Sequence, residues 1–272
     1  MKVLTFGEVM LRLKTPEHLK ILQADTFEAN YGGAEANVAV SLATLGDDVS
    51  YVTKVPEHQV GQAAVNEIRR FGVDTSRVLR GGGRVGIYYF EKGTNIRPTS
   101  VVYDRAYSAI AMAKAEEFDW EKLLDGVDFF YFSGITPAIS TEIEKALENA
   151  LALCREKKIQ VVCDLNYRGK MWSTKDAQRV MRRLMAYVDV CIANDEDFES
   201  SLGIPAYDGD MSRGIEQIES YKEGMLEIQK QFPNCKAVAS VLRNLYTVED
   251  GDWMGICLLY TSPSPRDRQK SR

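Results

Sequence analysis

Hydrophobic and polar positions in this chain repeat one unit several times, a short apolar run followed by an amphipathic stretch. Apolar runs separated by helices of about 10 to 18 residues indicate βαβ units and a parallel sheet covered by helices on both faces. Strands are predicted at residues 3–9, 49–55, 127–132, 159–165, 188–193 and 237–242. Helices are predicted at 61–71, 141–157, 175–186, 195–202 and 215–232, with one more after Gly33.

Two stretches interrupt this alternation. Residues 11–31 mix polar and apolar positions with little helical period. Residues 85–107 contain two β-branched and aromatic runs separated by a polar segment that includes Gly93, a pattern typical of a β-hairpin. We predict that the two stretches pair into a small second sheet, so the fold class is α/β with a mostly parallel sheet and a small β-sheet.

Adjacent glycines, Gly32 and Gly33, separate an extended segment from a helix with small and apolar residues on one face. Glycines allow a ligand to approach bare backbone, and the first amides of a helix have no partner inside it. These groups suit an oxygen-rich ligand such as a polyol or a sugar acid. The alternative is a turn that only lets a helix pack closely on a sheet.

Composition limits the class of protein and its partners. The chain has 272 residues, of which 45% are hydrophobic and 27% charged, as expected for one large globular domain. Its net charge of -5 comes from interspersed acids and bases, without the basic stripe that nucleic acid or an anionic membrane would need. We therefore expect a small-molecule partner. The chain shows neither a signal peptide nor a membrane-spanning apolar run, and we expect it in the cytoplasm.

Cysteine and histidine usage excludes two kinds of site. The two histidines, His18 and His58, lie in polar surroundings, which argues against a histidine metal site or a Ser-His-Asp triad. The five cysteines are an odd number without a Cys-x-x-Cys pair, so we predict reduced thiols, most of them in the core. They are Cys154, Cys163, Cys191, Cys235 and Cys257.

The last stretch, residues 257–272, differs from the rest. It has two prolines, four basic residues against one acid, and no apolar period after Tyr260. We predict that it is disordered and foreign to a domain of residues 1–256, replacing a lost C-terminal region. A genuine basic tail is the alternative.

Polar side chains follow two of the predicted buried strands. Asp164, Asn166 and Arg168 come after the run at 159–165, and strand alternation would place them on one side. Ligands bind beyond the carboxyl ends of strands in such sheets, although a polar loop held by an Arg–Asp pair is the alternative. Asn194 and Asp197 belong to an acidic cluster after the run at 188–193. This cluster either favours a helix dipole or holds hydrated Mg²⁺.

The predicted hairpin carries Tyr88 and Arg105, from which both could reach over the cleft. Arg105 and Arg168 together suit a carboxylate or a transferred phosphoryl group, because a guanidinium binds such oxygens in bidentate fashion. Either arginine alone is more often part of a surface ion pair.

At this point the motifs match a known family. The Gly32-Gly33-Ala34 turn with Asn37, the Asp164-Leu165-Asn166-Tyr167-Arg168 run and the Asn194 acid cluster resemble the ribokinase-like (PfkB) sugar kinases. Within that family, Ser133-Gly134-Ile135-Thr136-Pro137-Ala138, Tyr167-Arg168 and the Tyr103 to Arg105 segment resemble 2-keto-3-deoxygluconate kinases. The likeness covers about residues 1–256.

The resemblance implies a three-layer sandwich whose small β-sheet, from about 11–31 and 85–107, acts as a lid and often forms dimer contacts. It also implies ATP, Mg²⁺ and phosphoryl transfer to the primary hydroxyl of a sugar acid. The substrate residues that it implies are Gly32, Gly33, Asn37, Tyr88, Tyr103, Arg105, Asp164, Asn166 and Arg168. It assigns the nucleotide to Asn194 and Arg243, and it assigns Mg²⁺, through water, to Asp197, which stands where the family usually has Glu.

One departure bears on activity. The family takes its catalytic base from the Asp of a Gly-x-Gly-Asp turn, and the sequence has no such turn after Leu242. Loss of the anion hole at that turn typically costs about hundredfold or more in rate. We expect this chain to bind sugar weakly and to turn over little or no ATP. A kinase for fructose or a related keto sugar, and a non-catalytic sugar-binding domain, are the alternatives.

Overall fold

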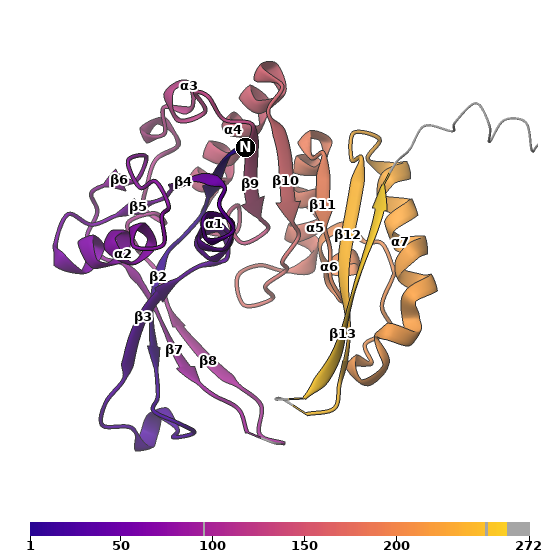
Figure 1. The fold of residues 1–272 in the computed structure, drawn as a ribbon, viewed down its shortest axis with the longest axis horizontal. Helices are drawn as coiled ribbons and strands as arrows, with labels where there is room; N and C mark the ends of the chain where they lie inside the picture. The colour runs from indigo at the N-terminus through magenta and orange to yellow at the C-terminus, as the bar shows by residue number, and fades with distance from the viewer. Residues whose placement is uncertain (95, 248–249, 260–272) are drawn as a thin grey trace, which may run out of the picture.

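A computed structural model of the protein describes residues 1–94, 96–247 and 250–259. Its central sheet has the strand order β13-β12-β11-β10-β9-β1-β4 (Figure 1), and only β12 and β13 pair antiparallel. The predicted mostly parallel sheet is therefore confirmed. The strands are β1 (Lys2–Phe6), β4 (Asp48–Val52), β9 (Phe129–Ser133), β10 (Gln160–Asp164), β11 (Val190–Ile192), β12 (Ala237–Leu245) and β13 (Gly251–Leu259).

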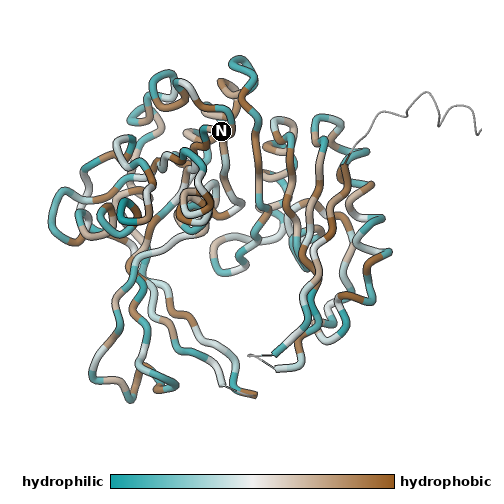
Figure 2. The backbone as a smooth tube through the Cα atoms, in the orientation of Figure 1, coloured by the Kyte–Doolittle hydropathy of each residue, from teal (hydrophilic) through white to brown (hydrophobic). Residues whose placement is uncertain are grey.

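Helices cover both faces of this sheet, because side chains of each strand alternate between two cores. On β1, Val3 belongs to the core under α1 and α2, whereas Leu4 and Phe6 belong to the larger core under the later helices. Figure 2 shows hydrophobic residues on the central strands and hydrophilic residues on the outer turns. The helices are α1 (Ala34–Thr44), α2 (Gln59–Arg69), α3 (Trp120–Leu123), α4 (Thr141–Lys157), α5 (Thr174–Leu184), α6 (Asp197–Leu202) and α7 (Ile218–Gln231).

The elements differ from the sequence prediction mainly at their ends. The predicted strand 49–55 is two strands, β4 and β5 (Lys54–Val55), and β5 pairs with β6 (Leu79–Arg80) instead of joining the main sheet. The break takes the residues after Val52 out of the central sheet. Short 3₁₀ turns lie at Ile21–Gln23, Ala115–Glu117, Met185–Tyr187, Met211–Arg213 and Ile215–Gln217.

The lid is a separate four-stranded sheet, in the order β3-β2-β7-β8. It projects from the edge of the domain below α1 and α2 (Figure 1). The pairing predicted for the two interrupting stretches is confirmed, and it places Tyr88 directly opposite Tyr103. The strands are β2 (Met10–Lys14), β3 (Glu28–Gly32), β7 (Gly86–Glu91) and β8 (Ser100–Asp104).

The first three residues of the predicted disordered tail form part of a strand, whereas the foreign origin of the tail stays a prediction. Cys257 to Leu259 belong to β13, where Cys257 pairs with Ala239 and Leu259 with Ala237. An alternating edge strand was missed because its side chains are half exposed and its partner supplies the pairing. The rest of the predicted tail, residues 260–272, lies outside the described residues.

Cysteines behave as predicted: all five are free thiols, and only Cys257 is exposed. Of the helices in the described ranges, none combines the length and the apolar character that crossing a membrane requires.

Candidate active site

Carboxyl ends of β10, β11 and β12 meet at one edge of the sheet, and two tight turns aim polar side chains at it. Asn166, just after β10, has φ +36°, and Asp195, after β11, has φ +38°. Asn and Asp tolerate this left-handed region better than most side chains. Strand alternation therefore does not apply beyond Asp164, but the turn still brings Asp164, Asn166 and Arg168 to one cavity.

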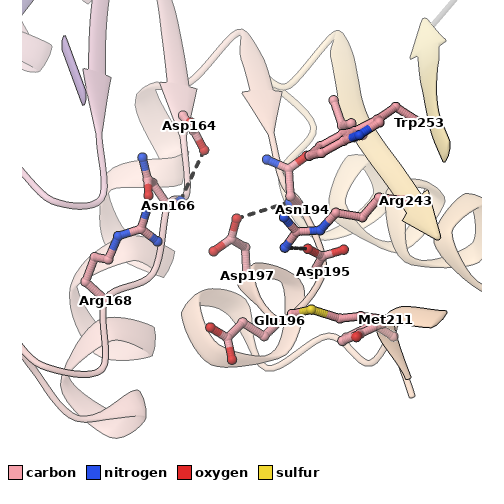
Figure 3. A pocket seen from close by; sticks show the side chains of 12 residues that line it. Asp164, Asn166, Arg168, Asn194, Asp195, Glu196, Asp197, Met211, Arg243 and Trp253 are labelled. Atoms are coloured by element: carbon pink, nitrogen blue, oxygen red, sulfur yellow. Dashed lines mark hydrogen bonds and ion pairs between the residues drawn. The ribbon is translucent and has the colours of Figure 1, made fainter. Parts of the chain in front are cut away.

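This strand-end cavity measures about 380 Å³ and holds several of the predicted site residues (Figure 3). Asp164 accepts a hydrogen bond from the backbone N–H of Asn166 at 3.2 Å, which fixes the turn after β10. The lining residues are Asp164, Asn166, Arg168, Asn194, Asp195, Glu196, Asp197, Tyr207, Met211, Val241, Arg243 and Trp253.

Asp197 ties two of these loops together. Its carboxylate accepts the backbone N–H of Tyr167 at 2.7 Å and that of Asn194 at 3.1 Å. Helix α6 begins at Asp197, two residues later than predicted. Both oxygens keep a lone pair for a water on a hydrated metal ion, and Asp164 and Glu196 line the same cavity. Residues 1–94, 96–247 and 250–259 contain no group of three such ligands, and the carboxylates present fit a Mg²⁺ ion that keeps most of its waters.

Two carboxyl groups here titrate near neutral pH. Burial, and then the negative charge of Asp197, raise the pKa of Asp164 to about 7. Burial also raises the pKa of Asp197 to about 6, although its two backbone donors act in the opposite direction. The cavity therefore gains negative charge between about pH 6 and pH 7.

Asp164→Asn should make the stability of the chain less dependent on pH. Between pH 3.8, the ordinary pKa of Asp, and about 7, the native state keeps a proton that the unfolded state has lost, so the free energy of unfolding falls as pH rises. Asparagine removes this loss and can still accept the Asn166 N–H. In metal-free buffer we expect the variant to gain on the order of 4 kcal/mol over the parent between pH 4 and pH 8. Thermal unfolding measures this gain, and an equal difference at both pH values would contradict the assignment.

Arg243 and Asn194 form the side of the cavity nearest the sheet edge. Arg243 makes an ion pair with Asp195, and its guanidinium lies 5.7 Å from the ring centroid of Trp253. Its buried Nε has no hydrogen-bond partner within the described residues, while the side chain as a whole is 29% exposed at the cavity. The side-chain oxygen of Asn194 accepts the N–H of Val241 at 2.8 Å, which leaves the amide nitrogen for a ligand. These donors fit the phosphates of a nucleotide.

A second cavity of about 320 Å³ lies between the lid and the loop after β10. Arg168 and Glu196 line both cavities and so stand at their junction. Arg105 reaches this lid cavity from the end of β8 and donates to the sulfur of Met171 at 3.2 Å. Its lining residues are Met10, Thr99, Val101, Tyr103, Arg105, Ile135, Tyr167, Arg168, Gly169, Lys170, Met171 and Glu196.

The double-glycine corner does not open into the lid cavity. Gly32 and Asn37 line a separate depression of about 210 Å³ beside α2. Gly33 packs on the backbone oxygen of Glu8, and Tyr88 packs against Tyr103 with the ring centroids 5.9 Å apart. Substrate contact by these residues stays a prediction.

Glu8 and Lys170 were not predicted to belong to the site. Glu8 is 2% exposed and makes an ion pair with Arg105. Lys170 donates to the carbonyl of Val101 at 2.9 Å, joining the loop after β10 to the lid. Gly7 separates Glu8 from the apolar run before it, and neither Glu8 nor Lys170 carries a local signal that could have identified it.

The fold is an α/β domain with two cavities at its strand ends, one of them beneath the lid. A model of the pfkB family of carbohydrate kinases matches residues 1–231. The chain belongs to this family.

Similar proteins agree with this assignment. A 2-dehydro-3-deoxygalactonokinase from Haloferax volcanii is 36% identical over 209 residues, which is 77% of this chain and 64% of that protein. The chain thus spans less than two thirds of this relative's length. A crystal structure of 2-dehydro-3-deoxygluconokinase from Thermotoga maritima has 47% identity and a TM-score of 0.89, and the match covers 95% of this chain and 76% of that one. The crystal structure of a PfkB family carbohydrate kinase from Listeria grayi has 31% identity and a TM-score of 0.86. The match covers 96% of this chain and 78% of that one.

Proposed function

We propose that this chain serves the ATP-dependent phosphorylation of a 2-keto-3-deoxy sugar acid, with 2-keto-3-deoxygluconate as the first candidate and its 6-phosphate as the product. Two similar proteins, a 2-dehydro-3-deoxygalactonokinase and a 2-dehydro-3-deoxygluconokinase, support this substrate class. They differ in the sugar, so the galactonate epimer is the natural competitor.

One observation carries the proposal: Arg168 lines both the strand-end cavity and the lid cavity. A sugar acid in the lid cavity and a nucleotide in the strand-end cavity would meet at this guanidinium. Two charge-assisted N–H donors can hold the sugar carboxylate or an oxygen of the transferred phosphoryl group. Arg105 and Tyr103 would complete the sugar site from the lid, with Asp164 and Asn166 on the opposite side.

The residues for the nucleotide and the metal lie on the strand-end side of Arg168. Asn194 and Arg243 would donate to the phosphates, and Asp197 would accept from water bound to Mg²⁺. When bound, Mg²⁺ neutralises charge on the phosphate oxygens. The free, mostly buried thiols are consistent with a reaction in the cytoplasm.

The lid is the proposed dimer contact. Strand alternation places Leu11, Ile87, Tyr89 and Val102 on the lid face that points away from Tyr88 and Tyr103. Val102 is 51% exposed. A second copy of the lid would cover this apolar face.

Calorimetric titration and an ADP-release assay test the proposed function. We expect the chain to bind 2-keto-3-deoxygluconate more tightly than fructose, and to release little ADP because the sequence lacks a Gly-x-Gly-Asp turn. The galactonate epimer, titrated in parallel, identifies the preferred sugar acid. Preference for fructose would reject the sugar-acid assignment, and rapid ADP release would reject the expected loss of turnover.

A further inference from the structure

Glu8 lies where the chain crosses from the central sheet to the lid. It comes two residues after β1 ends and two residues before β2 begins. Its carboxylate accepts the Ser108 hydroxyl at 2.6 Å and pairs with the guanidinium of Arg105. Buried carboxylates are normally ion-paired and hydrogen-bonded, and both partners of Glu8 follow β8 in the sequence.

The other crossings of the lid also meet Glu8. A Cβ added at Gly86, where β7 begins, would lie 2.8 Å from the Oε1 atom of Glu8. A Cβ added at Gly33, just after β3, would lie 1.9 Å from its backbone oxygen. Glu8 therefore contacts the base of all four lid strands, since it also leads into β2 itself.

We propose that Glu8 is a positioning residue at the base of the lid. Its carboxylate holds the Arg105 guanidinium at the lid cavity and fixes the crossings at β7 and β8 relative to the central sheet. The link to sugar binding rests on the proposed function, whereas the anchoring of the lid does not.

The balance of charge supports this role. The side chain of Arg105 is only 16% exposed, and that of Glu8 is 2% exposed. An arginine buried to this extent without a counter-charge gains hydration by turning toward solvent. Neutralising Glu8 would therefore release Arg105 from the cavity and loosen the end of β8.

Hydrogen exchange of the ligand-free chain tests the anchor. In Glu8→Gln, backbone amides of 86–91 and 100–104 should exchange at least about tenfold faster, while those of 129–133 and 160–164 keep the parent rates. Glu28→Gln is the matched control, because it removes an exposed ion pair with Lys14, at 2.9 Å, within the same lid. It should leave all four segments within about twofold of the parent.

A double-mutant cycle tests the link to the sugar. Glu8→Gln should weaken binding of 2-keto-3-deoxygluconate about tenfold, but should add no more than about twofold in an Arg105→Gln background, because Glu8 acts through Arg105. If Glu8 acted only through general stability, the losses of binding affinity caused by Glu8→Gln and Arg105→Gln would instead multiply.

Three results would overturn the proposal: parent exchange rates in the Glu8→Gln lid, faster exchange throughout the chain, or independent effects in the cycle. If Glu8→Gln does not fold, Arg105→Gln removes the same ion pair and must show the same regional exchange pattern. A parent chain that binds no sugar acid contradicts the proposed function, while exchange still decides the anchor.

Discussion

Arg168→Gln is expected to weaken binding of 2-keto-3-deoxygluconate about hundredfold and to leave fructose binding unchanged. Arg168 stands at the junction of the two cavities, and its backbone-directed bond, Nη1 to the carbonyl of Tyr167 at 2.8 Å, holds the guanidinium locally. Two charge-assisted hydrogen bonds to a carboxylate, at about 1.5 kcal/mol each, correspond to that factor. Calorimetric titration with both sugars measures it.

Two further variants define what Arg168 contributes. Arg168→Lys keeps the charge but loses the bidentate geometry, so about a tenfold loss is expected. Arg179→Gln removes an exposed arginine of α5, 3.7 Å from Asp176, and should bind the sugar acid like the parent. Equal losses for fructose and the sugar acid would show that Arg168 maintains the loop and does not recognise the carboxylate.

Gly33→Ala is expected to destabilise the chain by about 3 kcal/mol, which lowers the melting temperature by about 6–12 °C. The backbone of Gly33 is extended, at φ -174°, so alanine can adopt it. The cost comes from contact, because the new Cβ would lie 1.9 Å from the backbone oxygen of Glu8. A backbone atom cannot turn aside as a side chain can, so α1 must move away from the end of β1.

Gly83→Ala is the matched control for this substitution. A Cβ at Gly83 meets no atom within 4 Å, and the change should stay within about 0.5 kcal/mol of the parent. Thermal unfolding compares the two variants. Equal melting temperatures would mean that the corner accommodates a side chain, and the packing between Gly33 and Glu8 would then be looser than described.

Helix caps and continuous apolar runs in the sequence predicted the elements whose ends depend on neighbouring residues. Helix α4 was predicted with its observed bounds, because the side chain of Ser140 caps its N-terminus and accepts the N–H of Ile143. Strands β9 to β12 were found because a strand buried on both faces is a continuous apolar run. Strand β13 was missed because it is stabilised by pairing with β12 and not by its own pattern.

Tertiary contacts explain what the sequence left undecided at the site. Nothing local distinguishes Glu8 from a surface acid, since its burial depends on Arg105 and Ser108, about a hundred residues away. Gly32 and Asn37 likewise line the depression beside α2 because helices α1 and α2 pack together there. The residues at strand ends, Asp164 and Asn194, were placed correctly because parallel topology alone brings them to one edge.

The order of strands in the central sheet has a consequence for how the chain folds. Strands β10 to β13 each lie beside the strand that precedes them in the chain, so the half from β9 to β13 can assemble through short loop closures. Strand β1 instead joins β9, and the backbone N–H of Lys2 reaches Asp128 across 126 residues. Because distant pairings form slowly, docking of β1 should limit the folding rate, and β1 also carries the Glu8 anchor. We therefore expect the lid to acquire its fixed base late in folding, after β1 has docked.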